Sequence, residues 1–196
     1  MPVRVGVHVS IAGSLPVAVE RATERGCDCF QIFTRNPRGW AAREIPDDEA
    51  AAFRAAVSSS RLGPVIAHMP YLPNLASEKP DLFSKSVDTL TAELDRCDLL
   101  GIRYLVTHLG HTGDDPGTGR RRVIEAIRTA VSASRSETMV LLENTAGERN
   151  AVGSTLEEIR QVLDGIEDVC QAGICLDTCH AFAAGYEIRD GESVSR

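Results

Sequence analysis

The sequence predicts an α/β fold in which parallel strands alternate with helices, and within that class a TIM-type (β/α) barrel. The first observation is a set of six short apolar runs, at 3–9, 29–33, 64–68, 103–108, 138–143 and 172–177. Runs without polar alternation are typical of parallel strands that helices cover on both faces. The second observation is their spacing, because the later runs begin about 34 to 39 residues apart, which accommodates one β/α unit each. The chain therefore holds about six of the eight units of a barrel.

Helical stretches lie between the apolar runs, and each begins or ends with a recognisable signal. Ser14 precedes a first turn that contains Pro16, a position where proline is tolerated. The segment 47–60 opens with acidic residues, which suit the positive end of a helix dipole. The segment 81–101 ends on a glycine, a common helix C-cap. Segments 120–134 and 154–166 complete the alternation.

Composition limits the class of protein. A chain of 196 residues with 43% apolar residues can bury one substantial core, so we expect a single domain over 1–196. No apolar stretch approaches the roughly 18 residues of a transmembrane helix, and the N-terminus lacks the apolar region of a signal peptide. Six cysteines in such a chain indicate reduced thiols in a cytoplasmic protein. The formal net charge of −7, taken alone, argues mildly against a nucleic-acid partner.

Polar residues at the ends of the apolar runs favour a barrel over an open doubly wound sheet. The third and fourth runs end on His68 and His108, and the fifth ends on Glu143. The sixth ends on Asp177, with His180 just beyond. In a barrel the C-terminal ends of parallel strands share one rim, where these side chains can converge. In a doubly wound sheet they spread along an edge, and the chain lacks the G-x-G-x-x-G signature after its first strand.

The residue types at this rim suit a divalent metal. A single histidine at a strand end is usually only a polar residue at a mouth, but a buried carboxylate without a partner is costly. Imidazole nitrogens together with carboxylate oxygens suit zinc or another borderline divalent ion. A carboxylate between two ions can bridge them, which is the two-metal arrangement for cleaving phosphate esters. The pattern therefore indicates a metal-dependent hydrolase.

Other residues that often bind metals are interpreted as structural. Cys175 and Cys179 have the spacing of a zinc pair, but a structural site needs a second pair, so we expect reduced thiols. His8 ends the first strand and either faces the same rim or is a hydrogen-bonded neighbour of the site. His111 lies in a glycine-rich loop, and we expect it to be exposed.

Six motifs resemble the endonuclease IV family in order and spacing over essentially the whole chain. They are GVHVSIAGS at 6–14, QIFTRNPRGW at 31–40, AHMPYLPNLAS at 67–77, THLGH at 107–111, LENTAGERNAVG at 142–153 and LDTCHAFAAGY at 176–186. The resemblance implies a TIM-type barrel with three zinc ions that cuts DNA at abasic sites during base excision repair.

The resemblance also implies a role for each rim residue. His68 and His108 would bind one zinc, and Glu143 would bridge it to a second. Asp177 would bind the second zinc, and His180 would bind the third. The family's remaining ligands lie on the seventh and eighth strands and their loops, and these motifs are absent from the 196 residues. One site would then have three protein ligands, the second two and the third one.

The loops after the second and third strands offer residues that could contact DNA. Arg35, Arg38 and Trp40 lie on the first loop, and Tyr71 and Leu72 lie just beyond His68. A cation with an aromatic and an aliphatic wedge is what an enzyme needs to extrude a damaged nucleotide. The resemblance assigns Arg38, Tyr71 and Leu72 to this penetration of the base stack. The residues alone are equally compatible with core packing of Tyr71 and Leu72 and a solvated arginine loop.

The resemblance therefore implies a zinc-dependent phosphodiesterase that hydrolyses double-stranded DNA on the 5′ side of abasic sites. Glu143 would hold the metal pair and orient the nucleophile. Two alternatives stay open: a xylose-isomerase-like sugar isomerase or epimerase, and a non-catalytic fragment or subunit of a split barrel. The resemblance implies monomers for complete family members. Six units would leave the first and last strands with open edges, so we expect a domain incomplete at its C-terminus that self-associates.

Overall fold

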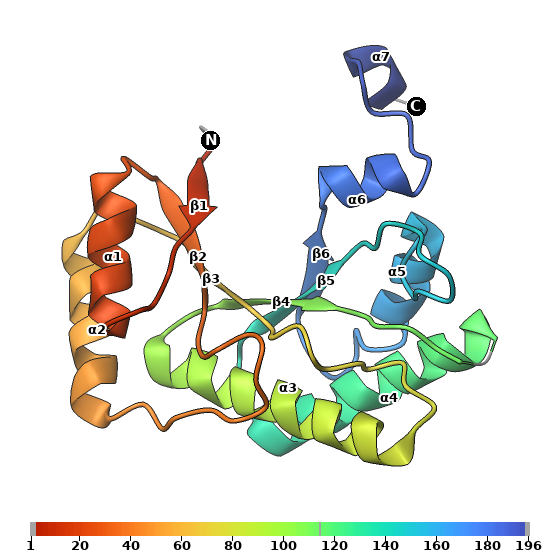
Figure 1. Ribbon diagram of the computed structural model, residues 1–196, viewed down its shortest axis with the longest axis horizontal. Coiled ribbons are helices and arrows are strands. Elements are labelled where there is room, and N and C mark those ends of the chain that lie inside the picture. The colour runs from red at the N-terminus through yellow and green to blue at the C-terminus, as the bar shows by residue number, and fades with distance from the viewer. Residues whose placement is uncertain (1–2, 114, 195–196) are drawn as a thin grey trace.

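The computed structural model describes residues 3–113 and 115–194, and within them six parallel strands form one sheet in chain order (Figure 1). The strands are β1 (Gly6–His8), β2 (Cys29–Phe33), β3 (Val65–His68), β4 (Tyr104–His108), β5 (Met139–Glu143) and β6 (Ala172–Cys175). The helices are α1 (Leu15–Glu24), α2 (Asp47–Ser59), α3 (Pro80–Leu100), α4 (Pro116–Ser134), α5 (Leu156–Asp164), α6 (Thr178–Ala183) and α7 (Gly191–Val194). This order confirms the predicted alternation of parallel strands and helices.

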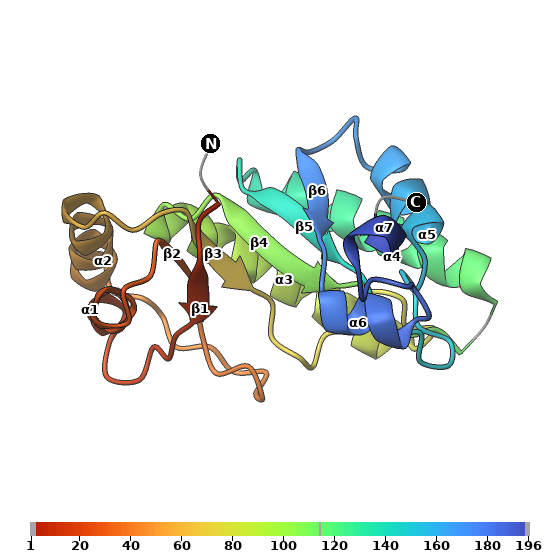
Figure 2. The same cartoon turned by 90° about the horizontal axis from the view of Figure 1, so that it is seen from above.

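The sheet curves into a trough, and the helices α1 to α5 lie along its outer side (Figures 1 and 2). Each strand pairs in parallel with its neighbour in the sequence, so all six C-terminal ends face the same rim. The β1 and β6 strands stand apart at the two sides of the trough, and each has a single neighbour in the sheet. The arrangement is a barrel wall that is open between β1 and β6.

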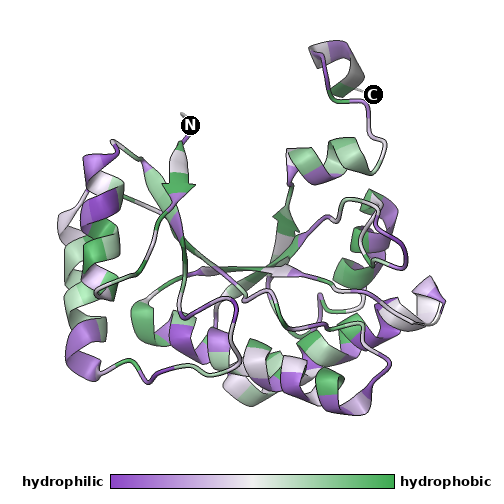
Figure 3. Ribbon diagram, viewed as in Figure 1, coloured by the Kyte–Doolittle hydropathy of each residue, from purple (hydrophilic) through white to green (hydrophobic). Residues whose placement is uncertain are grey.

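One hydrophobic core lies between the sheet and the covering helices. The residues of β2 alternate, with Phe30 and Ile32 fully buried and their neighbours half-buried. Helix residues such as Phe53, Leu90 and Ile127 are buried on the inner side, and the covering helices carry both hydrophobic and hydrophilic residues (Figure 3). Each large apolar side chain buried in this way contributes about 1.5–3 kcal/mol. This core fixes the strands whose ends carry the candidate site.

Helix boundaries follow local capping. Gly101 ends α3 in the left-handed conformation (φ 69°), as predicted. Helix α4 begins at Pro116, earlier than the predicted segment 120–134, because Asp115 caps it by accepting a hydrogen bond from the Thr118 amide. No helix among residues 3–113 and 115–194 has the length and apolar character needed to cross a bilayer.

Two expectations about the sixth strand and the edge strands were wrong. The strand β6 ends at Cys175 and not at Asp177, which instead caps α6 by accepting a hydrogen bond from the His180 amide. The helices α6 and α7 were not predicted. The edge strands are not buried on both faces, since Val7 is 45% and Ile174 46% exposed. Each edge strand has a single neighbouring strand among the described residues, so its other edge stays open.

Candidate metal centre

Five side chains predicted at the rim come together beyond the C-terminal ends of β3, β4, β5 and β6. Ligand atoms of His68, His108 and Glu143 all lie within 4.8 Å of one another. Those of Glu143, Asp177 and His180 form a second group with the same spacing. The β4 and β5 register places His108 directly beside Glu143, so the sheet itself brings this pair together. Their role as metal ligands stays a prediction.

Glu143 belongs to both groups and offers a different oxygen to each. Its Oε2 lies 3.0 Å from His68 Nε2 and 3.4 Å from His108 Nε2. Its Oε1 lies 3.7 Å from His180 Nδ1. Two ligands bonded to one tetrahedral zinc at about 2.0–2.1 Å lie roughly 3.3 Å apart, which is the spacing seen here. The carboxylate thus faces His68 and His108 with one oxygen and His180 with the other.

Hydrogen bonds fix the tautomers of two histidines. A backbone carbonyl can only accept, so His68 Nδ1 donates to Met69 O at 2.6 Å, and His180 Nδ1 donates to Asn144 O at 2.9 Å. In a neutral imidazole this leaves Nε2 with a lone pair available for a metal. A lone pair of His68 facing a carboxylate oxygen at 3.0 Å is repulsive without a proton or a cation between them. The donor set therefore fits a divalent ion.

The surroundings of the centre favour the neutral form of His108. Burial lowers the pKa of His108, and the neighbouring His68 and His180 lower it further, although Glu143 opposes them. A neutral imidazole is the form that binds a metal. Burial also raises the pKa of Cys175 to about 11, with a smaller contribution from Glu143 and Asp177. The Cys175 thiol therefore stays protonated, in agreement with its interpretation as a reduced thiol.

Asn144 is a residue of the centre that the sequence analysis missed. Its side chain is buried, donates to Asp177 O at 3.0 Å and accepts from the Asp177 amide at 2.6 Å. These two bonds hold the start of α6 against the end of β5. The only local signal is its place directly after Glu143, and its partner lies 33 residues away.

The three predicted DNA-contacting residues lie on the same rim and outside the core. Arg38 is exposed, Tyr71 is 58% exposed and Leu72 is 38% exposed. The Tyr71 ring contacts Phe33 at a centroid distance of 5.2 Å, and its amide donates to Pro37 O at 3.0 Å. Their exposure does not fit the core-packing interpretation of Tyr71 and Leu72. Contact with DNA stays a prediction.

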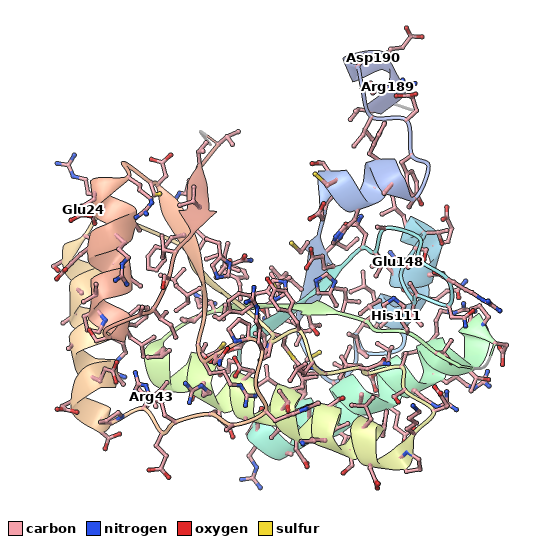
Figure 4. All side chains as sticks on the ribbon, in the orientation of Figure 1. Glu24, Arg43, His111, Glu148, Arg189 and Asp190 are labelled. Atoms are coloured by element: carbon pink, nitrogen blue, oxygen red, sulfur yellow. The ribbon has the colours of Figure 1, made fainter. Side chains whose placement is uncertain are left out.

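A cavity of about 290 Å³ lies beside the cluster. Tyr71, Leu72, His108 and His180 line it, together with His111 and Glu148 from the loops after β4 and β5 (Figure 4). His111 is exposed as predicted, but its position on this cavity was not foreseen. The cavity joins two predicted metal ligands, His108 and His180, to two predicted DNA-contacting residues, Tyr71 and Leu72.

His8 contacts residues of β2, the neighbouring strand. Its Nδ1 lies 2.8 Å from Gln31 Oε1, and its ring lies 4.4 Å from that of Phe33. His8 belongs to neither group of possible metal ligands among the described residues. All six cysteines are free thiols, and Cys179 is exposed.

Comparison with known proteins places this geometry in a family. A family model described as a xylose isomerase-like TIM barrel matches residues 19–194. A probable endonuclease 4 from Methanoculleus marisnigri is 56% identical over 194 residues, covering 98% of this chain and 69% of the relative. A probable endonuclease 4 from Nitrosopumilus maritimus is 46% identical, covering 95% of this chain and 67% of the relative. The chain thus spans about two thirds of the length of these relatives.

Solved structures agree with the sequence relatives. The crystal structure of endonuclease IV from Thermus thermophilus has a TM-score of 0.84 at 40% identity, covering 94% of this chain and 66% of that chain. A D-psicose 3-epimerase from Clostridium cellulolyticum has a TM-score of 0.68 at 15% identity, covering 94% of this chain and 67% of that chain, which shows the fold alone. The predicted TIM-type barrel is confirmed.

Proposed function

The chain belongs to the xylose isomerase-like TIM-barrel family and to its endonuclease IV members, and from this premise we propose that it is a DNA repair endonuclease. The substrate is double-stranded DNA with an abasic site, and the reaction is hydrolysis of the phosphodiester on its 5′ side. The observation that carries the proposal is the pair of ligand groups that share Glu143 beside a cavity lined by Tyr71 and Leu72.

We assign the metal sites residue by residue. His68, His108 and Glu143 would hold one zinc, Glu143 and Asp177 would contribute to a second, and His180 would contribute to a third. Zinc in such a site supplies Lewis-acid chemistry, which lowers the pKa of water and offsets negative charge on phosphoryl oxygens. The net charge of −7 taken alone argues against binding to nucleic acid. Bound zinc ions would offset the charge of the acidic ligands at the rim, which weakens this argument.

The protein's own groups position the reaction. We assign Glu143 as the catalytic residue. One of its oxygens faces His68 and His108, the other faces His180, and the carboxylate would orient the nucleophile. Asn144 keeps Asp177 at the start of α6 through paired hydrogen bonds. Arg38, Tyr71 and Leu72 enter the base stack at the lesion, and the exposure of Tyr71 and Leu72 supports this role over core packing.

A sugar epimerase has a similar barrel, but the structure offers it no specific support. The likeness to solved epimerases is at 13–19% identity, so it extends to the fold alone. Exposed wedge residues at the rim favour a nucleic-acid substrate. Six free thiols support a reducing compartment, and we propose the cytoplasm.

The open edges lead us to propose that the 196-residue chain self-associates. The side chains of Val7 on β1 and Ile174 on β6 are 45% and 46% exposed on strands with one neighbour each. Exposed apolar edges favour pairing with another chain. Light scattering at increasing protein concentration is expected to show a rising mean mass, and a constant monomer mass would contradict this.

A strand-cleavage assay tests the proposed function. The zinc-loaded protein is incubated with an abasic duplex, with the intact duplex and, separately, with ketose sugars. We expect slow cutting of the abasic strand only, abolished by Glu143→Gln and retained by Glu125→Gln, an exposed glutamate on α4 outside both ligand groups. Equal cutting of both duplexes, or sugar turnover that depends on Glu143, would overturn the proposal.

A further inference from the structure

A cluster of charged side chains is buried beneath the loop after β2. Glu93 on α3 has a side chain with no exposed surface, and the side chains of Arg35 and Arg96 are 5% and 11% exposed. Arg35 Nε lies 2.8 Å from Glu93 Oε1, and Thr34 Oγ1 donates to Glu93 Oε2 at 2.7 Å. Arg96 Nε lies 3.8 Å from the same carboxylate. We call Glu93, Arg35 and Arg96 the buried charge cluster.

The buried charge cluster bonds the backbone of residues 34–43, which we call the recognition loop. Arg96 donates from Nε to Thr34 Oγ1 at 2.8 Å, from Nη2 to Thr34 O at 2.5 Å and from Nη1 to Arg43 O at 2.9 Å. Arg35 donates from Nη1 to Trp40 O at 3.1 Å. Arg96 therefore holds the two ends of the recognition loop, and Arg35 holds its middle. Figure 4 labels Arg43 on the segment that leads to α2.

The outer part of the recognition loop carries the exposed Arg38. The Arg38 amide donates to Asn36 Oδ1 at 3.0 Å, so the turn at this point is fixed locally. The Tyr71 amide donates to Pro37 O at 3.0 Å, which ties the recognition loop to the next loop of the rim. Lys85 Nζ lies 4.3 Å over the ring of Trp40. A shift of the recognition loop would therefore move both Arg38 and Tyr71.

Burying these three charged side chains costs desolvation free energy, so the cluster is a poor means of stabilising the fold. Burial raises the pKa of Glu93, which Thr34 and the two arginines oppose, and two cations share one anion. Replacing buried ion pairs by apolar side chains of similar volume is often neutral or stabilising. The 2.8 Å contact of Arg35 is an ion pair and not a well-aligned hydrogen bond, and Arg35 Nη2 has no hydrogen-bond partner among the described residues. What the cluster provides is geometry, because a planar guanidinium fixes several acceptors at once.

We propose that Glu93, Arg35 and Arg96 are positioning residues that hold the recognition loop, and with it Arg38 and Tyr71, in the pose that discriminates abasic from intact DNA. The inference rests on the proposed function, because the reading of damaged DNA by this rim belongs to that proposal. The three residues act through the loop backbone and do not themselves contact the substrate.

The chain contains a single tryptophan, Trp40, so its fluorescence reports on the recognition loop without any DNA. The variant Arg35→Lys keeps a cation beside Glu93 but loses the fork that also reaches Trp40 O. Acrylamide quenching of Trp40 is expected to increase in this variant. The control Arg128→Lys, which alters an arginine that bonds Gly165 O and Asp168 far from the loop, is expected to leave quenching unchanged. Unchanged quenching in folded Arg35→Lys would overturn the proposal.

The DNA arm uses the ratio of Kd for intact duplex to Kd for abasic duplex. We expect this ratio to fall about tenfold in Arg35→Lys, a size typical of coupling through a positioned element. Adding Arg35→Lys to the double variant Arg38→Ala, Tyr71→Ala should cause no further loss of discrimination, because Arg35 acts through these two residues. Additive losses, or full discrimination in a variant with increased quenching, would overturn the inference.

Two further outcomes separate failure of the inference from other failures. In the first, the unmodified chain shows no preference for abasic DNA, while quenching still responds to Arg35→Lys. The proposed function then fails, and so does the role of the cluster in discriminating DNA. The conclusion that the cluster holds the recognition loop is unaffected. If Arg35→Lys does not fold by thermal melting, Arg96→Gln takes its place, since Arg96 is less buried and bonds both ends of the recognition loop. The same expectations apply to it.

Discussion

At the scale of single residues, Glu143 organises the candidate site. Its Oε2 faces two histidines from β3 and β4, while its Oε1 faces His180 from α6. A histidine can serve one group only, but this carboxylate serves both. Removal of Glu143 should therefore affect more of the centre than removal of any single histidine.

Metal content after substitution measures this asymmetry. We expect His108→Ala to reduce bound zinc by the equivalent of one site, and Glu143→Gln to reduce it further, because both groups lose a ligand. Elemental analysis of protein refolded with zinc and desalted gives the stoichiometry. A chain that binds no divalent ion, or equal losses in the two variants, would contradict a shared carboxylate.

The predicted metal ligands were easier to identify from the sequence than the buried polar residues that hold neighbouring segments in place. A histidine or carboxylate at the end of each of the last four apolar runs is visible in the sequence, and parallel topology then gathers these ends on one rim. Asn144 and the pair of Arg35 with Glu93 were not identified, because each depends on a partner 33 or more residues away. No local pattern marks a buried polar group whose partner comes from another element.

At the scale of elements, the loops after β2 and β3 form one surface. The Tyr71 amide bonds Pro37 O, and the Tyr71 ring contacts Phe33 at the end of β2. Loops on the C-terminal face of a barrel can change without loss of the core, which is why function gathers there. Binding and stability should therefore respond differently to changes in these loops.

The variant Tyr71→Ala separates the two properties. We expect a weaker preference for abasic over intact duplex, with a change in the free energy of unfolding of about 1 kcal/mol or less, as is usual for exposed positions. Duplex binding and thermal unfolding are measured on the same preparation. A large loss of stability with unchanged DNA preference would favour the core-packing interpretation.

A second element-scale prediction concerns the contact between α1 and α2. Glu49 accepts a bond from the Leu15 amide at 3.0 Å and pairs with Arg43 through both oxygens at 2.7 Å. The Arg43 hydrogen bond lowers the pKa of Glu49 below its ordinary value of 4.5. A carboxylate with a lowered folded-state pKa stabilises the fold above its unfolded pKa and loses that contribution as pH falls through the folded value.

Melting temperature as a function of pH tests this contact. Glu49→Gln should lower the melting temperature at pH 7 and flatten its decline below about pH 4.5. Glu125→Gln, an exposed glutamate on α4, should follow the unmodified chain. If the melting temperatures of Glu49→Gln and of the unmodified chain change in parallel with pH, the contact of Glu49 does not contribute to the pH dependence of stability.

Element boundaries were predicted best where local signals and tertiary packing agree. The strand β2 matches its apolar run at both ends, and α3 stops at Gly101 as a left-handed C-cap requires. The end of β6 was misplaced because Leu176 extends the apolar run, although Asp177 already caps α6. Apolar character alone does not separate the last strand residue from the residue that leads into a cap.

At the scale of the whole molecule, the six units form a trough whose β1 and β6 edges stay apart. The relatives are longer, and this chain spans about two thirds of their length. We propose that two further β/α units complete both the wall and the metal centre, since the second and third sites have fewer protein ligands than the first. If the barrel is split, a second chain would have to supply these two units.

The most direct test is single-turnover cutting of an abasic duplex at matched zinc, by the 196-residue chain and by the same chain extended with family-like units seven and eight. Charge must be stabilised on both the attacking and the leaving oxygen, and a missing interaction of this kind costs about 10²-fold or more in rate. We therefore predict that the extended chain cuts at least about 10²-fold faster, and that Glu143→Gln in the extended chain cancels the gain. If the 196-residue chain cuts as fast as the extended one, the assignment of the metal ligands is wrong.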